Sequence, residues 1–174
     1  MRCVQGSHRW VGNYMRNISL AFALAMIFGP VHAQAPQYRV VGVSDGDTIR
    51  VLSANRQLIK CRMYGIDAPE SSQDYGQRSK AALSDGIYQR MVSVEILDQD
   101  QYGRSVCRIF LNGVDVNKLQ LQRGMAWHYK RYSQDAAYSQ AESAARQQRL
   151  GLWSDSNPTP PWSFRRNGKA VNYR

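Results

Sequence analysis

Histidine and cysteine are scarce in this chain of 174 residues, which contains three of each. His128 is the only histidine after residue 33, so a mechanism that uses a pair of histidines is excluded for that part of the chain. No cysteine has a CxxC partner or a nearby histidine pair, which excludes the common zinc patterns. The HExxH motif and the glycine-rich phosphate loop are also absent.

Residues 1–33 have the features of an export signal. They contain three arginines and no acidic residue, and the apolar run 18–28 is interrupted only by Ser19. That run suits a signal peptide and is too short to span a bilayer as a helix. We expect cleavage after Ala33 and a periplasmic or secreted location, without membrane insertion after processing. A start at Met15 would give a more ordinary signal, and an uncleaved anchor is the alternative.

The chain also contains fewer acidic residues than basic ones, 13 against 23. Its net charge is +10, and removal of residues 1–33 takes away three basic residues and no acidic ones. The remaining 141 residues therefore carry a net charge of +7, on a length that suits one domain. Such a surplus favours nucleic acid, acidic polysaccharide or anionic lipid as a partner, without choosing among them.

Hydrophobic periodicity and turn residues predict an α+β fold. Five strands are expected at 38–44, 48–52, 57–64, 92–97 and 105–111, and three helices at 75–88, 116–123 and 135–149. This order is compatible with a five-stranded OB-fold β-barrel within a domain of residues 34–156. The basic segment 157–174 contains three prolines and is expected to be an extended tail.

Three short segments carry the residues from which a phosphodiester-cleaving site can be built. They are Asp45-Gly46-Asp47-Thr48, the run from Arg62 through Asp67-Ala68-Pro69-Glu70, and Tyr102-Gly103-Arg104. Such a site must hold a cation against the phosphate, activate a water and stabilise the charge that grows on phosphorus. Three carboxylates and two guanidinium groups in these segments can supply those functions. Each segment alone is also explained by a hairpin turn or a surface ion pair.

In combination and order, these segments resemble the staphylococcal nuclease (thermonuclease) family, over about residues 38–153. The resemblance implies an OB-fold enzyme that cleaves DNA and RNA by attack of water on phosphorus, leaving 3′-phosphate ends. It assigns Arg62 and Arg104 to the scissile phosphate and Glu70 to the attacking water. Ala68 stands where the best-known member has threonine.

The resemblance also implies a cation and a stacking platform. Calcium would be held by Asp47, Asp67 and the backbone carbonyl of Thr48, with water oxygens completing its irregular shell. Stacking of bases falls to Tyr102, Tyr129 and Tyr132, which border the nucleotide pocket in the family. Trp127 and Trp153 are expected to pack in or against the core.

Two other classes of function remain open at this point. One is an OB-type module that binds nucleic acid or another polyanion without cutting it, and the other is an envelope protein that uses its basic face on lipid or glycan. The complete set of Asp47, Asp67, Glu70, Arg62 and Arg104 favours the enzyme. We expect a monomer that acts on DNA and RNA.

Cys61 and Cys107 are the cysteines that remain after residue 33. They lie on the third and fifth expected strands, which are neighbours in an OB barrel, and their parity directs both side chains to one face. A disulfide and a pair of reduced, buried thiols are both compatible with this placement.

Overall fold

The computed structural model describes residues 36–171, with the side chains of 168–171 left out of the description. The expected signal peptide, residues 1–33, lies outside the described residues. Within 36–171, no helix is both long enough and apolar enough to cross a membrane.

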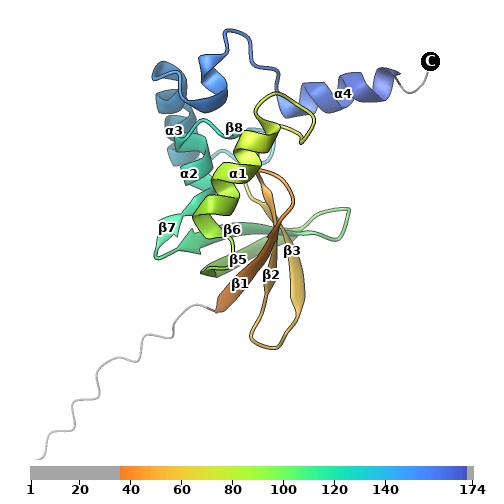
Figure 1. The fold of residues 1–174 in the computed structure, drawn as a ribbon, viewed down its shortest axis with the longest axis vertical. Helices are drawn as coiled ribbons and strands as arrows, with labels where there is room; N and C mark the ends of the chain where they lie inside the picture. Colours follow the sequence, from red (N-terminus) through yellow and green to blue (C-terminus); the bar gives the residue numbers. More distant parts are fainter. Residues whose placement is uncertain (1–35, 172–174) are drawn as a thin grey trace, which may run out of the picture. The chain divides into compact units, whose positions relative to one another are not determined.

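Five strands form a closed barrel, which confirms the expected fold class (Figure 1). Antiparallel pairing joins the strands in the order β3-β2-β1-β5-β6, and a parallel pairing of β3 with β6 closes the barrel. Their bounds are Gln37–Val43 (β1), Thr48–Leu52 (β2), Leu58–Met63 (β3), Met91–Gln99 (β5) and Ser105–Leu111 (β6). Three shorter strands are additional: Ile66–Asp67 (β4) pairs with Trp127–His128 (β8), and Val114–Asp115 (β7) pairs with β6.

Alternation along the strands builds the barrel interior. On β2 and β3, Ile49, Val51, Cys61 and Met63 are buried, while the residues between them are more exposed. Burial of such side chains stabilises the fold by about 1.5–3 kcal/mol each. The side chains of Cys61 and Cys107 meet in this interior as free thiols, with their Sγ atoms 2.9 Å apart. The expected proximity of the two cysteines is therefore confirmed, and a covalent bridge stays a prediction.

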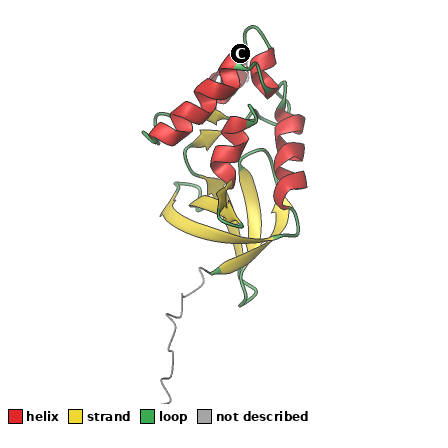
Figure 2. Cartoon of the chain, turned by 90° about the vertical axis from the view of Figure 1, so that its left-hand side faces the viewer, coloured by secondary structure: helices red, strands yellow, loops and turns green. Residues whose placement is uncertain are grey.

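The three expected helices form within a few residues of their predicted bounds. Figure 2 shows the helices gathered at one end of the barrel. They are Gly76–Ile87 (α1), Val116–Gln122 (α2) and Ala136–Gln147 (α3), followed by a 3-10 turn at Gly151–Ser154 (η1). Asp115 and Asp135 accept hydrogen bonds from backbone N–H groups in the first turns of α2 and α3, so both helices begin at a favourable cap.

The expectation of an extended tail after residue 157 is wrong. Residues Pro161–Val171 form a fourth helix, α4. Pro161 is the first residue of this helix, where proline costs no hydrogen bond and its ring fixes a helical φ angle. Pro161 is buried, and Trp162 and Phe164 are partly buried, so an apolar face holds α4 against the domain.

Candidate active site

The turn between β1 and β2 fixes the position of Asp47. Asp45 Oδ1 accepts a hydrogen bond from the Asp47 N–H at 3.0 Å, which confirms Asp45 as a turn former. The buried Gln120 of α2 donates to the Gly46 carbonyl at 3.1 Å. A Cβ atom on Gly46 would lie 1.8 Å from Ser79 Oγ, so only glycine allows α1 to pack this closely. Two helices therefore hold the turn in place.

Arg62 joins the two carboxylates that the sequence assigned to a cation. It lies on β3 in register with Thr48 of β2, at the end of the strand pair that follows the turn. Its Nη1 is 2.9 Å from Asp47 Oδ2, and its Nη2 is 2.8 Å from Asp67 Oδ1. Both carboxylates are buried, with side-chain exposures of 7% and 1%. We call Asp47, Arg62 and Asp67 the carboxylate cluster.

Burial controls the ionisation of Asp47. Desolvation raises its pKa to about 7, while the charge of Arg62 and a hydrogen bond from the Ala68 N–H lower it. That N–H donates to Asp47 Oδ2 at 2.6 Å. Because the contact is made by the backbone, it does not depend on the side chain at position 68. A second positive charge beside Asp47 would favour its ionised form further.

Thr48 is engaged within the hairpin. Its hydroxyl donates to Asp47 Oδ1 at 3.1 Å, and its carbonyl accepts from the Ser44 N–H at 2.9 Å. A carbonyl oxygen has a second lone pair, so this bond still leaves one acceptor position. The role of Thr48 as a cation ligand stays a prediction.

The carboxylate cluster suits a hard cation with an irregular oxygen shell. Asp47 and Asp67 approach each other closely enough to share one guanidinium group. Among residues 36–171, no three His, Cys, Asp or Glu side chains are arranged as a metal site. A cation here would therefore need carbonyl and water oxygens in addition to the two aspartates. Calcium accepts such a shell more readily than magnesium, which requires a stricter octahedron.

Glu70 lies on the loop that leads from β4 to α1. Its N–H donates to Gln73 Oε1 at 3.2 Å, and its carbonyl accepts from the Gln73 N–H at 2.8 Å. A Cβ atom on Gly76 would lie 1.9 Å from the Glu70 carbonyl oxygen, so α1 begins in direct contact with this loop. The Glu70 side chain is 38% exposed, which leaves its carboxylate open to solvent beside the cluster.

Arg165 of α4 lies at the carboxylate cluster, where the sequence analysis did not place it. Its Nη2 is 2.8 Å from Asp67 Oδ2, and its Nη1 lies 3.2 Å from Asp67 Oδ1 and 2.6 Å from Glu70 Oε1. Asp67 and Glu70 are 98 and 95 positions away from Arg165 in the sequence, so no local sequence pattern predicts the contact. The basic residues after position 157 were the available signal.

Arg104 is not joined to the cluster in this structure. Its Nε is 2.7 Å from Asp100 Oδ2, within the turn between β5 and β6. Burial works against the ionised form of Asp100, but hydrogen bonds from the backbone and side chain of Arg104 and from the backbone of Tyr102 leave its pKa lowered. In the described part of the chain, no hydrogen bond or ion pair links Arg104 to the three carboxylates of the motifs. Its role at the scissile phosphate stays a prediction.

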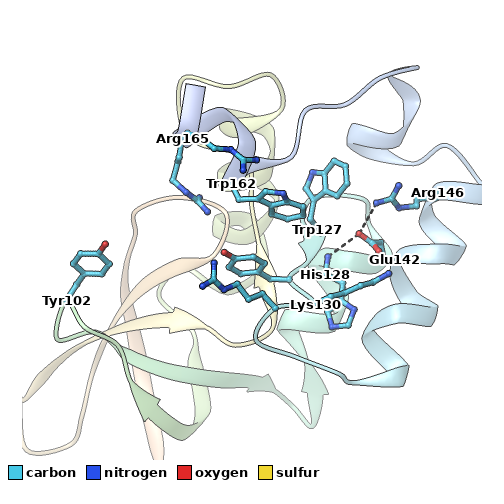
Figure 3. Close-up of a pocket in the computed structure, with 11 residues that line it drawn as sticks. Tyr102, Trp127, His128, Lys130, Glu142, Arg146, Trp162 and Arg165 are labelled. Carbon is cyan, nitrogen blue, oxygen red and sulfur yellow. Dashed lines mark hydrogen bonds and ion pairs between the residues drawn. The ribbon is translucent and has the colours of Figure 1, made fainter. Parts of the chain in front are cut away.

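A cavity of about 870 Å³ adjoins the site (Figure 3). Two of the three predicted stacking residues line it, Tyr102 and Tyr129, and Tyr102 is 73% exposed. Tyr132 does not line it and packs with its edge against Tyr129, at 5.0 Å between ring centroids. The other lining residues are Trp127, His128, Lys130, Arg131, Glu142, Arg146, Trp162, Arg165 and Arg166. We call this cavity the cleft.

Three of the aromatic residues that line the cleft, Trp127, Tyr129 and Trp162, pack against other rings. Trp127 packs edge-on against Trp153 at 4.4 Å, and both are buried, which confirms their expected packing role. Trp162 of α4 packs edge-on against Trp127 and stacks on Tyr129, with ring planes 4° apart and centroids 5.4 Å apart. Trp162 is a second residue that the sequence analysis did not place at the site.

Comparison with known proteins agrees with this geometry. The family model described as staphylococcal nuclease homologue matches residues 60–155. The chain belongs to the staphylococcal nuclease family. It is 43% identical over 131 residues to an uncharacterized endonuclease of Haemophilus influenzae, covering 75% of this chain and 74% of that protein. It is 41% identical over 141 residues to a micrococcal nuclease of Shigella flexneri, covering 75% and 80% of the two chains.

The candidate site extends beyond the matched segment at both ends. Arg62, Asp67 and Glu70 lie within residues 60–155, whereas Asp47 precedes the segment and α4 follows it. Family membership identifies the chain as a hydrolase acting on the ester bonds of nucleic acid. The predicted enzyme class is therefore confirmed.

Proposed function

We propose that this nuclease is an exported, calcium-dependent endonuclease that hydrolyses both DNA and RNA and leaves 3′-phosphate ends. The observation that supports it most is the sharing of Arg62 by Asp47 and Asp67, with Glu70 beside them. This arrangement gathers negative charge for a cation, positive charge for a phosphate and a carboxylate for a water in one place.

The carboxylate cluster would bind the cation and the scissile phosphate. Asp47 and Asp67 would hold the calcium ion, which would supply positive charge to polarise the phosphate. The Arg62 guanidinium has five N–H donors in a planar fork, so it can keep its bonds to the aspartates and still donate to a phosphate oxygen. Fixed in this way, Arg62 needs little reorganisation to stabilise charge that develops on phosphorus.

Glu70 would activate the attacking water. Its carboxylate takes a proton from the water as the new oxygen–phosphorus bond forms, and the bond from phosphorus to the 5′-oxygen breaks. The leaving 5′-oxygen takes its proton from solvent, and the phosphate remains on the 3′-oxygen. The loop contacts of Glu70 with Gln73 and Gly76 hold the carboxylate on the side of the cluster that faces solvent.

Both DNA and RNA fit this chemistry. Because water is the nucleophile, the reaction does not need a ribose 2′-hydroxyl. Tyr102 and Tyr129 offer ring faces or edges to the cleft, and stacking on an aromatic ring tolerates every base. We expect the protein to act as a monomer. The features of residues 1–33 support export to the periplasm or the medium.

End-labelled DNA and RNA strands, incubated with the purified mature protein in calcium, in magnesium and in chelator, test the proposal. We expect cleavage of both strands in calcium and none in chelator, with products whose mobility changes after phosphatase treatment. The Glu70→Gln variant should bind the strands and cleave them at least about 100-fold more slowly. Binding by the wild-type protein without cleavage in any condition would instead indicate a non-catalytic binding protein.

A further inference from the structure

Helix α4 lies outside the segment that matches the family model, yet it docks directly on the active site. The match ends at residue 155, and α4 begins at Pro161. Gln73, whose side chain bonds the Glu70 N–H, also donates to the Thr159 carbonyl just before the helix. Trp162 packs on Trp127 and Tyr129, and Arg165 reaches Asp67 and Glu70. The position of α4 is therefore set by contacts to the loop that carries Glu70 and to the aromatic residues at and after β8.

The cleft lies between α4 and the segment that follows β8. Trp162, Arg165 and Arg166 of α4 contribute to its lining, and Tyr129, Lys130 and Arg131 contribute from the other side. Figure 3 shows Trp162 and Arg165 on one side of the cleft, with His128 and Lys130 on the other. The volume of the cleft, about 870 Å³, lies within the range of sites that hold a small ligand, about 300–1,000 Å³. A segment of a single strand fits such a space.

The cleft contains positively charged side chains that are not paired with carboxylates of the described residues. Arg146 is paired with Glu142 at 3.2 Å, and Arg165 is paired with the catalytic carboxylates. Lys130, Arg131 and Arg166 form no ion pair with any carboxylate of the described residues, and all three are exposed. Unpaired cations on both walls of one cavity, beside stacked aromatic rings, match the charge of a nucleic-acid backbone.

We propose that α4 forms a second wall of the substrate cleft, and that Arg166 on this wall binds a backbone phosphate of the nucleic-acid strand outside the cleaved bond. Lys130 and Arg131 face it across the cleft and bind the same strand. Arg165 fixes α4 to the active-site loop through Asp67 and Glu70 and so sets the width of the cleft. The inference rests on the proposed function and names an additional part of its substrate site.

Binding of a fluorescent single-stranded oligonucleotide, measured by anisotropy in chelator over a series of salt concentrations, tests the inference without cleavage. Each phosphate contact contributes about 0.7 to the slope of log affinity against log salt for a single strand. We expect Arg166→Ala to weaken binding severalfold at low salt and to reduce this slope by about 0.7. Arg131→Ala should do the same, and the double variant should show both changes.

Two variants separate a phosphate contact from a loss of charge or of fold. Arg39→Ala removes the same charge from an exposed position on β1 and should leave the slope within error of the wild-type value. Arg166→Lys keeps a point charge that binds phosphate and should retain most of the slope. Circular dichroism of each variant confirms that α4 and the barrel are intact.

An unchanged affinity and slope in Arg166→Ala would overturn the inference. Tighter binding in that variant would also overturn it, because α4 would then obstruct the cleft rather than line it. If wild-type protein cleaves nucleic acid while Arg166→Ala binds normally, only the inference fails. If wild-type protein neither binds nor cleaves a strand, the proposed function fails as well.

Discussion

The carboxylate cluster and the cleft differ in the burial and the ion pairing of their charged side chains. In the cluster, Asp47 and Asp67 are buried and share Arg62 at 2.8–2.9 Å, and Asp67 is also paired with Arg165 at 2.8 Å. In the cleft, Lys130, Arg131 and Arg166 are exposed and form no ion pair within the described residues. Changes in the cluster should therefore alter stability and chemistry together, whereas changes in the cleft should alter binding alone. The two regions meet at Arg165, which reaches from one to the other.

Arg62→Ala should have the largest effect, because it leaves two buried carboxylates without their shared partner. Breaking a buried ion pair from one side costs about 3–5 kcal/mol, and we expect a loss of that size in the free energy of unfolding. Urea denaturation followed by circular dichroism measures it. Arg39→Ala, an exposed control, should change the value by less than about 0.5 kcal/mol. Equal stability of the two variants would show that the cluster is not a buried, coupled unit.

The thiols of Cys61 and Cys107 provide a second test of the barrel below the cluster. In an oxidising compartment we expect a thiol–disulfide oxidant to take two electrons and two protons from the pair and leave a bridge. The bridge would close a loop of 46 positions and would stabilise the fold by about 4 kcal/mol in the chain-entropy model. Mass spectrometry after alkylation, with and without reduction, reports the state of the pair. Two free thiols in the exported, folded protein would refute the bridge.

Gly76→Ala tests whether the loop that carries Glu70 must be placed accurately. The new Cβ would meet the Glu70 carbonyl at 1.9 Å, so the loop or α1 must move. A misplacement of about 1 Å can cost about 100-fold in rate, and we expect a loss of that order in kcat. Gly86→Ala in the same helix meets nothing closer than 3.8 Å and should stabilise the protein by about 0.5–1 kcal/mol with normal activity. Similar kcat values for the two variants would contradict the positioning role of the loop.

Arg165→Ala tests how the contact between the cleft and the carboxylate cluster affects calcium binding. The variant removes a positive charge that bonds both oxygens of Asp67, so calcium should bind the free protein more tightly. Because Arg165 is 40% exposed, we expect a gain of no more than about tenfold. Isothermal titration with calcium measures it, with Arg166→Ala as the control of equal charge. A weaker calcium affinity in Arg165→Ala would mean that Arg165 supports the cation site instead.

The barrel and the cluster were predictable because their signals are local. Alternating residues such as Ile49, Val51, Cys61 and Met63 indicate strands, and the spacing of Arg62, Asp67 and Glu70 carries the family resemblance. The role of Asp47 could be predicted only from the same resemblance. A turn sequence alone does not show that Gln120 and Ser79, on two helices, support the turn.

The wall of the cleft was not predictable, for two physical reasons. Three prolines within 158–161 favoured an extended tail, and their pattern does not show that Pro161 begins a helix. The contact of Arg165 with Asp67 spans 98 positions and depends on how Trp162 packs on Trp127. Arg104 differs in another way: its pairing with Asp100 four positions earlier competes with the role that the family motif gives it.

Calcium titration of the Asp67→Asn variant by calorimetry tests the central claim most directly, because the claim is that the carboxylate cluster holds the cation. We expect wild-type protein to bind calcium and to cleave nucleic acid only when calcium is bound. Asp67→Asn keeps the shape of the side chain and should lose measurable binding, while Asp85→Asn, an exposed control on α1, should bind as wild type does. Calcium binding by Asp67→Asn that equals the wild-type affinity would contradict the account.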